Sequence, residues 1–304
     1  MSRGKESTGH LFAVITILIW GTTFISTKVL LRAFSPIEIL FLRFTIGLIA
    51  LSFVYPHRLK LQGRTQELYF AAAGLSGVTF YYLLENIALT YTFASNVGVI
   101  ISISPFFTAI FAHLFLEGEK LKPQFFVGFV VALAGIFLIS FHGSSVLKLN
   151  PFGDVLAVLA AVVWAAYSIL TKKISGFHHN TIQTTRRIFF YGLVFMIPAL
   201  FIFRFHPKPD LLIQPINLFN ILFLGLGASA LCFVTWNSAV GILGAVKTSV
   251  YIYSVPVITV VTSVIVLHEK ITGIAVLGIV LTLAGLFLSE HKISAKAKGA
   301  LEHE

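Results

Sequence analysis

The sequence predicts an all-α membrane protein with ten transmembrane helices, arranged as two inverted five-helix repeats. Of its 304 residues, 57% are hydrophobic and only 11% are charged, whereas soluble globular chains carry about 25% charged residues. Apolar runs of about 20 residues, the length that crosses a bilayer, recur along the chain. The two halves of the chain also resemble each other. Together these observations indicate that lipid surrounds most of the protein.

The apolar runs give the expected helices in chain order. The first half has spans at 10–30, 36–55, 68–91, 95–116 and 123–141, and the second half has spans at 152–172, 187–204, 217–238, 247–267 and 272–290. Charged or turn-forming segments such as Pro56-His57-Arg58 and His142-Gly143-Ser144 separate them. The first run is too long for a signal peptide and lacks a small-residue cleavage pattern, so we count it as a span.

The distribution of basic residues predicts the orientation. With a cytoplasmic N-terminus, 15 of the 22 Lys and Arg residues fall on the inner side and six on the outer side, while Arg43 lies within a span. This bias follows the positive-inside rule. We therefore expect a multi-pass protein of the inner (plasma) membrane with both termini cytoplasmic and a tail at 291–304. The net charge of +10 is scattered through loops, which argues against a nucleic-acid partner.

An internal repeat supports the two-bundle arrangement. Residues 11–28 read LFAVITILIWGTTFISTK and residues 155–172 read VLAVLAAVVWAAYSILTK, so Trp20 matches Trp164 in register. Further matches are Lys28 with Lys172, Arg43 with Arg187, Gly74 with Gly225, Asn86 with Asn237, Pro105 with Pro256, Glu119-Lys120 with Glu269-Lys270, Gly128 with Gly278, and Gly135 with Gly285. Composition alone would match Leu, Ile and Val rather than Trp, Asn and Pro.

The odd number of spans in each half predicts inversion. A second half with five spans must enter the membrane from the opposite face to the first. Inverted repeats place a binding site near the midplane at their interface, and rocking of one half against the other exposes it alternately to either side. This architecture is typical of transporters.

The matched segments resemble the EamA domain of the drug/metabolite transporter superfamily. The resemblance depends on Trp20-Gly21, Lys28, Leu42-Arg43-Phe44, Ser104-Pro105-Phe106, Glu119-Lys120 and Ala134-Gly135. It covers a first EamA repeat at 10–141 and a second at 152–290, which departs from the pattern at Ala165 and His268. It implies a ten-helix carrier with a central cavity that exports amino acids or other small metabolites.

Polar and aromatic side chains within the spans are the candidates for the substrate pathway, because they are costly in lipid without partners. These are Trp20, Thr23, Tyr81, Tyr82, Glu85, Asn86, Ser102, Ser104, Trp164, Tyr167, Trp236, Asn237, Tyr251 and Ser254. For each aromatic residue the alternative is an interfacial anchor that faces lipid. Pro105 and Pro256 lie within spans, so we expect each to kink its helix.

Two charged residues within spans have alternative roles. We expect Glu85 to bind a substrate amine or to carry a coupling proton, because a charge at the bilayer centre costs about 3 kcal/mol on insertion scales. The alternative is a carboxylate that reaches the membrane surface. Arg43 could hold a carboxylate, or it could tie its helix to the carbonyls of a neighbour.

The sequence therefore predicts a secondary transporter that exports amino acids or related metabolites by alternating access. The alternative substrate class is drugs or organic cations. A membrane enzyme or a scaffold is disfavoured, since the chain has no GxxxxGK[ST] or HExxH motif. We expect no cofactor, no metal and a monomer, either coupled to protons or working by facilitated diffusion. The single cysteine, Cys232, excludes an intramolecular disulfide.

Overall fold

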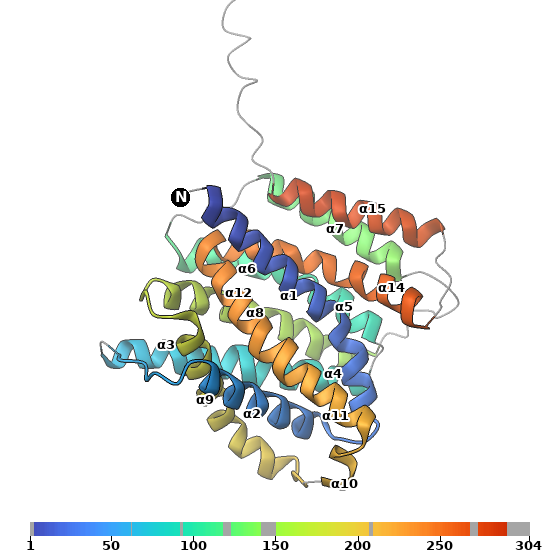
Figure 1. Ribbon diagram of the computed structural model, residues 1–304. Coiled ribbons are helices and arrows are strands. Elements are labelled where there is room, and N and C mark those ends of the chain that lie inside the picture. The colour runs from blue at the N-terminus through green and yellow to red at the C-terminus, as the bar shows by residue number, and fades with distance from the viewer. Residues whose placement is uncertain are drawn as a thin grey trace, which may run out of the picture.

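The computed structural model describes residues 3–61, 63–91, 94–117, 123–140, 150–206, 209–267 and 273–290. Within these residues every regular element is a helix (Figure 1). The first half contains α1 (Arg3–Leu30), α2 (Pro36–Val54), α3 (Arg64–Gly74), η1 (Leu75–Phe80), α4 (Tyr81–Tyr91), α5 (Ala94–Ile101), α6 (Ser104–Phe115) and α7 (Pro123–Ser140). The second half contains α8 (Pro151–Ser175), α9 (Thr181–Ile202), α10 (Pro209–Leu212), α11 (Pro215–Leu222), η2 (Phe223–Leu231), α12 (Cys232–Leu243), α13 (Ala245–Ser249), η3 (Val250–Tyr253), α14 (Ser254–Leu267) and α15 (Gly273–Glu290).

Long apolar helices dominate the described part of the chain. Five are long and apolar enough to cross a membrane: Gly4–Leu30, Pro36–Val54, Pro151–Ser175, Thr181–Ile202 and Pro215–Leu243. Shorter apolar helices lie at Ser104–Phe115, Pro123–Leu138, Ala245–Ile258 and Val276–Ser289. The protein is therefore an integral membrane protein, and the count of ten spans stays a prediction. The predicted Glu-Lys matches at 119–120 and 269–270, His268 and the tail at 291–304 lie outside the described residues.

Two helices begin six or seven residues earlier than the apolar runs indicated. α1 begins at Arg3 rather than at residue 10, and α9 begins at Thr181 rather than at residue 187. The side chain of Asn180 accepts a hydrogen bond of 2.9 Å from the Ile182 amide and caps α9. Such a cap satisfies an amide that has no partner within the helix. Arg186, which precedes the predicted span at 187–204, therefore lies within α9.

The matched third helices of the two halves each contain a π-helical segment. α3, η1 and α4 form one helix in the first half, and α11, η2 and α12 form its counterpart in the second. Gly74 and Gly225, which are matched in sequence, lie at these segments and pack against α9 and α2 respectively. A Cβ atom at Gly74 would lie 2.6 Å from the Ile188 carbonyl oxygen, and one at Gly225 would lie 2.7 Å from the Ile46 side chain. Glycine is therefore required at both positions for this close packing.

The helices that carry the matched prolines are interrupted rather than bent. α5 ends at Ile101 and α6 begins at Ser104, which makes Pro105 the second residue of α6. The turn η3 separates α13 from α14, and Pro256 is the third residue of α14. Proline is well tolerated in a first turn, because the amide that it lacks has no helical partner there. The expected mid-helix kinks are thus breaks just before each proline.

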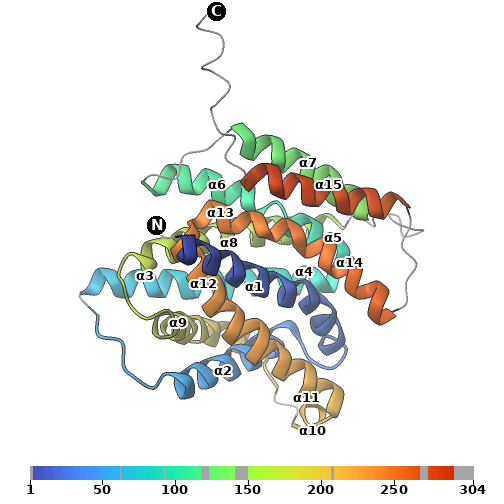
Figure 2. The same cartoon turned by 45° about the horizontal axis from the view of Figure 1, so that its top comes forward.

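α7 and α15 lie side by side at one edge of the molecule (Figures 1 and 2). A Cβ at Gly128 would lie 2.5 Å from the Gly285 carbonyl oxygen, and one at Gly135 would lie 2.5 Å from the Gly278 oxygen. The start of each helix therefore meets the end of the other, so the two helices are antiparallel. Because Gly128 matches Gly278 and Gly135 matches Gly285 in sequence, the second contact is the symmetric counterpart of the first.

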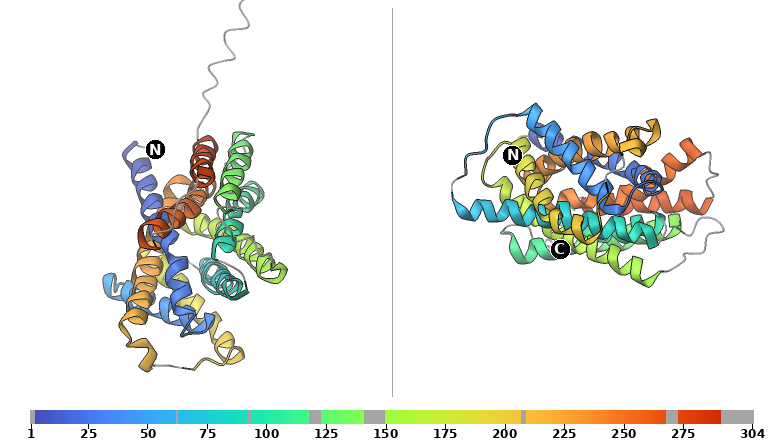
Figure 3. Two further views of the ribbon diagram at one scale, coloured as in Figure 1. Left: turned by 90° about the vertical axis from the view of Figure 1, so that its right-hand side faces the viewer. Right: turned by 90° about the horizontal axis from the view of Figure 1, so that it is seen from below.

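α1 runs antiparallel to the helix formed by α11, η2 and α12, and Figure 3 gives two further views of this bundle. Near the start of α1, a Cβ at Gly9 would lie 2.8 Å from the side chain of Leu243, the last residue of α12. Further along α1, Trp20 Nε1 donates a 3.0 Å hydrogen bond to the Ala228 carbonyl oxygen in η2. From Gly9 to Trp20, the contacts of α1 thus move from the end of α12 back to η2. The two helices are therefore antiparallel.

A matched pair of lysines, one in each half, joins the ends of neighbouring helices. Lys28 Nζ donates to the Leu89 carbonyl oxygen at 2.6 Å, and Lys172 Nζ donates to the Gly241 oxygen at 3.1 Å. The end of α1 thus meets the end of α4, and the end of α8 meets the end of α12. Since α12 is antiparallel to α1 and parallel to α8, the matched helices α1 and α8 run in opposite directions.

Candidate functional site

A cluster of indole and phenyl rings lies where the two halves meet. The Trp20 ring lies 5.2 Å from Trp164 and 5.1 Å from Trp236, measured between ring centroids, and Phe233 lies 6.1 Å from both Trp20 and Trp164. Trp164 and Trp236 are 2% and 0% exposed. These two tryptophans are therefore core residues and not lipid-facing anchors. The matched pair of Trp20 and Trp164 meets face to edge at the contact between the repeats.

A small cavity of about 40 Å³ lies beside this cluster, and we call it the central cavity. Its walls come from both halves of the chain. Six of its lining residues are among those expected from the sequence: Trp20, Thr23, Tyr81, Tyr82, Glu85 and Trp164. Phe24, Ile101, Ile252 and Val255 complete the lining. The structure thus gathers these six predicted residues from α1, α4 and α8 around one space.

Glu85 is the carboxylate of this cavity. It lies on α4, and its side chain is 5% exposed. The polar groups that act on it are the Tyr81 hydroxyl and the Arg43 guanidinium. A carboxylate in this position does not reach the membrane surface, so the surface alternative does not fit. It faces a space where a cation or a proton can approach.

Arg43 is a buried guanidinium beside the cavity rather than in its lining. It is 1% exposed, and its Nε donates a 2.9 Å hydrogen bond to Ser229 Oγ in η2. Its Cζ lies 4.4 Å from the centre of the Tyr82 ring, and Tyr82 lines the cavity. Nε thus ties α2 to a hydroxyl of a neighbouring helix rather than to a backbone carbonyl, and the expectation that Arg43 holds a carboxylate stays a prediction. The Tyr82 ring therefore lies between the Arg43 guanidinium and the cavity that Glu85 lines.

The matched asparagines have different surroundings. Asn237 accepts a 2.6 Å hydrogen bond from the Tyr167 hydroxyl and donates a 3.0 Å bond to Thr185 Oγ1. Asn86 is fully buried, and neither atom of its amide group has a hydrogen-bond partner in the described structure. Buried amides without partners are destabilising by about 1–3 kcal/mol. The two halves are therefore equivalent in sequence but not in their local structure.

The remaining predicted residues lie outside the cavity lining. The Ser102 hydroxyl donates to the Gly98 carbonyl oxygen at 2.8 Å, and Ser104 is buried at the start of α6, where its hydroxyl has no hydrogen-bond partner among the described residues. Ser254 begins α14 and is partly buried. The Tyr251 hydroxyl lies 2.5 Å from His10 Nδ1, near the start of α1. This contact places the Tyr251 hydroxyl beside the N-terminal part of α1 and outside the lining of the cavity.

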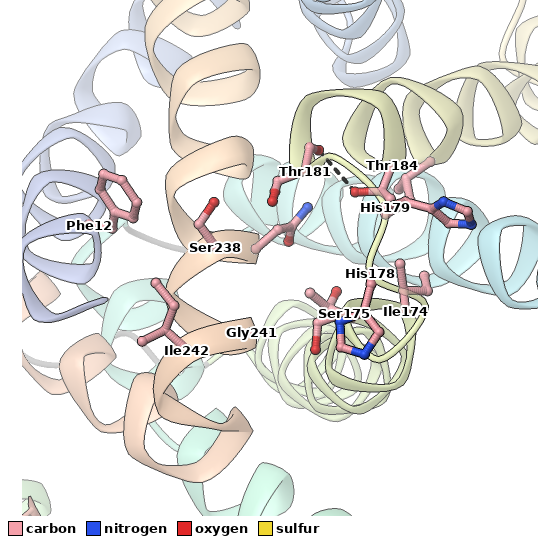
Figure 4. Close-up of a pocket in the computed structure, with 13 residues that line it drawn as sticks. Phe12, Ile174, Ser175, His178, His179, Thr181, Thr184, Ser238, Gly241 and Ile242 are labelled. Carbon is pink, nitrogen blue, oxygen red and sulfur yellow. Dashed lines mark hydrogen bonds between the residues drawn. The ribbon is translucent and has the colours of Figure 1, made fainter. Parts of the chain in front are cut away.

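A second, larger space was not expected from the sequence. It has a volume of about 460 Å³ and lies at the turn between α8 and α9, against the end of α12 (Figure 4). His178, His179, Ser238 and Phe12 are among its lining residues, and Asn237 lies in its wall. We call this space the vestibule. Its polar residues come from α8, α9, the turn between them and α12, so only the tertiary packing brings them together.

The described residues contain no group of three or more His, Cys, Asp or Glu side chains that could hold a metal ion. Besides Glu85 and Arg43, the polar groups described around the two spaces include dispersed hydroxyls, amides and indoles. Such groups can orient a solute by hydrogen bonds, and the aromatic walls can pack against its apolar part.

The chain is similar to known transporters. The model of the EamA-like transporter family matches residues 7–141 and 151–290. An uncharacterized transporter of Archaeoglobus fulgidus is 29% identical, over 94% of this chain and 99% of its own length. A probable terminal-alkyne amino-acid exporter of Streptantibioticus cattleyicolor is 26% identical, over 94% and 95% of the two chains. A probable amino-acid metabolite efflux pump of Escherichia coli is 23% identical, over 92% and 93%.

The fold is also shared with a solved structure. A crystal structure superposes with a TM-score of 0.74, over 93% of this chain and 96% of that chain. The two sequences are 21% identical, so this likeness concerns the fold alone.

Proposed function

The chain belongs to the EamA-like transporter family, and from this premise we propose that it exports amino acids or related small metabolites. It is a transporter and not an enzyme. The proposed route passes through the central cavity by alternating access. The chain is proposed to work as a monomer, either with protons as the coupling ion or by facilitated diffusion.

The proposed topology is ten transmembrane helices in two inverted repeats, with both termini in the cytoplasm. The opposite directions of α1 and α8 support the inversion, and so does the symmetric antiparallel contact of α7 with α15. The distribution of Lys and Arg supports the orientation. In this topology the central cavity lies between the two bundles near the middle of the bilayer.

The observation that carries the proposal is the composition of the central cavity. Indole and phenol rings from both halves surround a single carboxylate, Glu85. Rings grip the apolar body of a solute, and a buried carboxylate favours an ammonium group over water. An amino acid or a related amine carries both features. Two relatives named for amino-acid or amino-acid-metabolite export point in the same direction.

The second candidate substrate class is organic cations, including drugs. Glu85 would serve as the counter-charge, and Trp20 and Trp164 would offer faces for cation–π contact, which contributes about 2 kcal/mol in desolvated sites. The two classes differ in the carboxylate of the solute. An amino acid brings a negative group that must also find donors, whereas a simple organic cation does not.

A proteoliposome assay separates these possibilities. Purified protein is reconstituted, and uptake is measured for a panel of amino acids and for tetraphenylphosphonium, with and without a pH gradient. Liposomes without protein are the control for leakage. Saturable movement of at least one amino acid supports the proposal. Movement of tetraphenylphosphonium alone would favour the second class, and no movement of any compound across the panel would contradict transport of either class.

A further inference from the structure

We propose that the vestibule is a separate binding site for a small amphipathic zwitterion and that Tyr167 and Asn237 form the gate between it and the central cavity. The proposal deepens the transport function proposed above and depends on it for its biological meaning. Three features of the structure support it: the size and lining of the vestibule, the position of the Tyr167–Asn237 hydrogen bond, and the packing that holds the Tyr167 ring.

The vestibule has the size and the lining of a small-molecule site. Its volume of about 460 Å³ falls within the range of about 300–1,000 Å³ that is typical of ligand pockets. Phe12 and Ile242 give it an apolar side, and Thr181, Thr184 and Ser238 offer hydroxyl groups (Figure 4). It is more than ten times the volume of the central cavity, which has room for only part of a solute.

The charge of the lining selects the class of ligand. None of the residues that line the vestibule is Asp, Glu, Lys or Arg, and the titratable groups are the imidazoles of His178 and His179. A lining without a carboxylate does not favour a simple cation over a solute with both charges. Hydroxyls and imidazoles can donate to a carboxylate, and the apolar side can contact a side chain. The chemistry therefore fits an amino acid with an apolar or hydroxylated side chain.

One side-chain pair separates the vestibule from the central cavity. Asn237 lies in the vestibule wall, and it accepts a 2.6 Å hydrogen bond from Tyr167. On its other side the Tyr167 ring lies 5.0 Å from the ring of Trp164, which lines the central cavity. Thr185 receives the second bond of the asparagine amide and fixes its orientation. From the vestibule wall to the wall of the central cavity, the order is thus Asn237, the hydrogen-bonded Tyr167 and then Trp164.

The Tyr167 ring is held by close packing against the first half of the chain. A Cβ at Gly77 would lie 2.1 Å from the Tyr167 ring, so the absence of a side chain in η1 makes room for it. Tyr167 itself is 0% exposed. Gly77 and Tyr167 belong to different halves, so a movement of the halves relative to each other changes the packing of this ring. The gate is therefore coupled to the rocking motion that alternating access requires.

The equivalent layer on the other side of the cavity is built differently. Thr23 and Asn86 match Tyr167 and Asn237 by the repeat registers. Thr23 lines the cavity, while Asn86 is fully buried and its amide atoms have no hydrogen-bond partner in the described structure. A Thr side chain is too short to replace the tyrosine. The matched residues of the first half therefore do not form a counterpart of the Tyr167–Asn237 hydrogen bond. The gate is formed by residues of the second half.

Cysteine accessibility tests the gate without any need for transport. In a Cys232→Ala background, one reporter is Thr23→Cys in the central cavity and the other is Ser238→Cys in the vestibule. Protein in nanodiscs, open to solvent on both faces, is treated with the cationic thiol reagent MTSET. We expect fast labelling at position 238 and slow labelling at position 23. Equal rates at the two positions would overturn the gate.

Changes at the gate should speed labelling at position 23 alone. Tyr167→Phe removes the hydrogen bond to Asn237. The net contribution of one such bond corresponds to labelling at position 23 that is about two- to tenfold faster. Tyr167→Ala removes the ring as well and should have a larger effect, and Tyr91→Phe, an exposed tyrosine at the end of α4, should have none. If Tyr167→Phe does not fold, Asn237→Ala breaks the same bond. An unchanged rate at position 23 in every folded gate variant would overturn the proposal.

Protection from labelling tests the binding site. L-phenylalanine, L-leucine or L-threonine at millimolar concentration should slow labelling of Ser238→Cys, whereas tetramethylammonium should not. Absence of protection by all three amino acids would overturn the assignment of the vestibule. The labelling results do not depend on transport. Loss of all transport activity with the gate results intact would therefore count against the proposed function and not against the gate.

Discussion

The antiparallel contact between α7 and α15 predicts that matched substitutions in the two helices have matched effects on stability. Gly135 and Gly285 are matched in the two repeats, and each lies where the opposite backbone passes. A Cβ at Gly135 would lie 2.4 Å from the Thr282 amide nitrogen, and a Cβ at Gly285 would lie 2.3 Å from the Ala132 amide nitrogen. Gly135→Ala and Gly285→Ala should therefore destabilise the protein to a similar extent.

The magnitude follows from the distances. Ordinary contacts of a Cβ atom are 3.4–4 Å, so the helices must separate by about 1 Å, which forfeits about a quarter to a half of the dispersion energy of the affected contacts. Overpacking of this kind costs about 1–3 kcal/mol. Alanine is favoured over glycine within a helix by up to about 1 kcal/mol, which offsets part of the loss. We expect a net loss of about 1–2 kcal/mol for each variant.

The measurement is the free energy of unfolding in mixed micelles, obtained by titration with SDS and followed by the helical circular dichroism signal. Gly98→Ala is the matched control, because the nearest atom to a Cβ there is 3.9 Å away. It should leave stability unchanged or raise it slightly. The reasoning is refuted if both test variants behave like Gly98→Ala, or if only one of them loses stability.

Two further predictions concern buried polar groups. Glu85→Gln should abolish or strongly reduce transport at normal expression. Glu6→Gln, which changes a half-exposed ion pair near the N-terminus, should leave transport unchanged. Full pH-dependent transport by Glu85→Gln would contradict the role assigned to Glu85. Ser229→Ala leaves Arg43 Nε without its acceptor and should lower the free energy of unfolding by about 1–3 kcal/mol. Wild-type stability of Ser229→Ala in the SDS titration would mean that another group satisfies the guanidinium.

The sequence was most informative about helices and their pairing. Bilayer spans need long apolar runs, and the register of Trp20 with Trp164 led to two tryptophans that meet at the contact between the repeats. The matched glycines of α7 and α15 likewise lie against each other. Both signals are readable because they depend on side chains whose size or rarity leaves a mark in the sequence.

The details of the backbone were less predictable. Pro105 and Pro256 pointed to kinked helices, while the structure has a break before each proline, because a proline is accommodated without loss in a first turn. The π-helical segments η1 and η2 have no local sequence signal beyond the glycines beside them. They depend on packing against α9 and α2, which are distant in the chain.

Side-chain partners across the bundle were also out of reach. The sequence predicts Tyr251 for the substrate pathway because it is an aromatic residue within a span, yet its hydroxyl lies beside His10 near the start of α1. The vestibule depends on the turn between α8 and α9 meeting the end of α12. Such encounters are set by tertiary packing, so one sequence without its structure does not reveal them.

The inverted arrangement of the two repeats is the claim on which the account depends most. Arg32 and Gly176 occupy matched positions just after the first helix of each repeat, and both are exposed. In a Cys232→Ala background, single cysteines at these positions can be labelled with a membrane-impermeant maleimide in intact cells and after permeabilisation. We predict that Arg32→Cys reacts in intact cells and that Gly176→Cys reacts only after permeabilisation. Reaction of both cysteines from the same side of the membrane would contradict the inverted repeat and the transport route built on it.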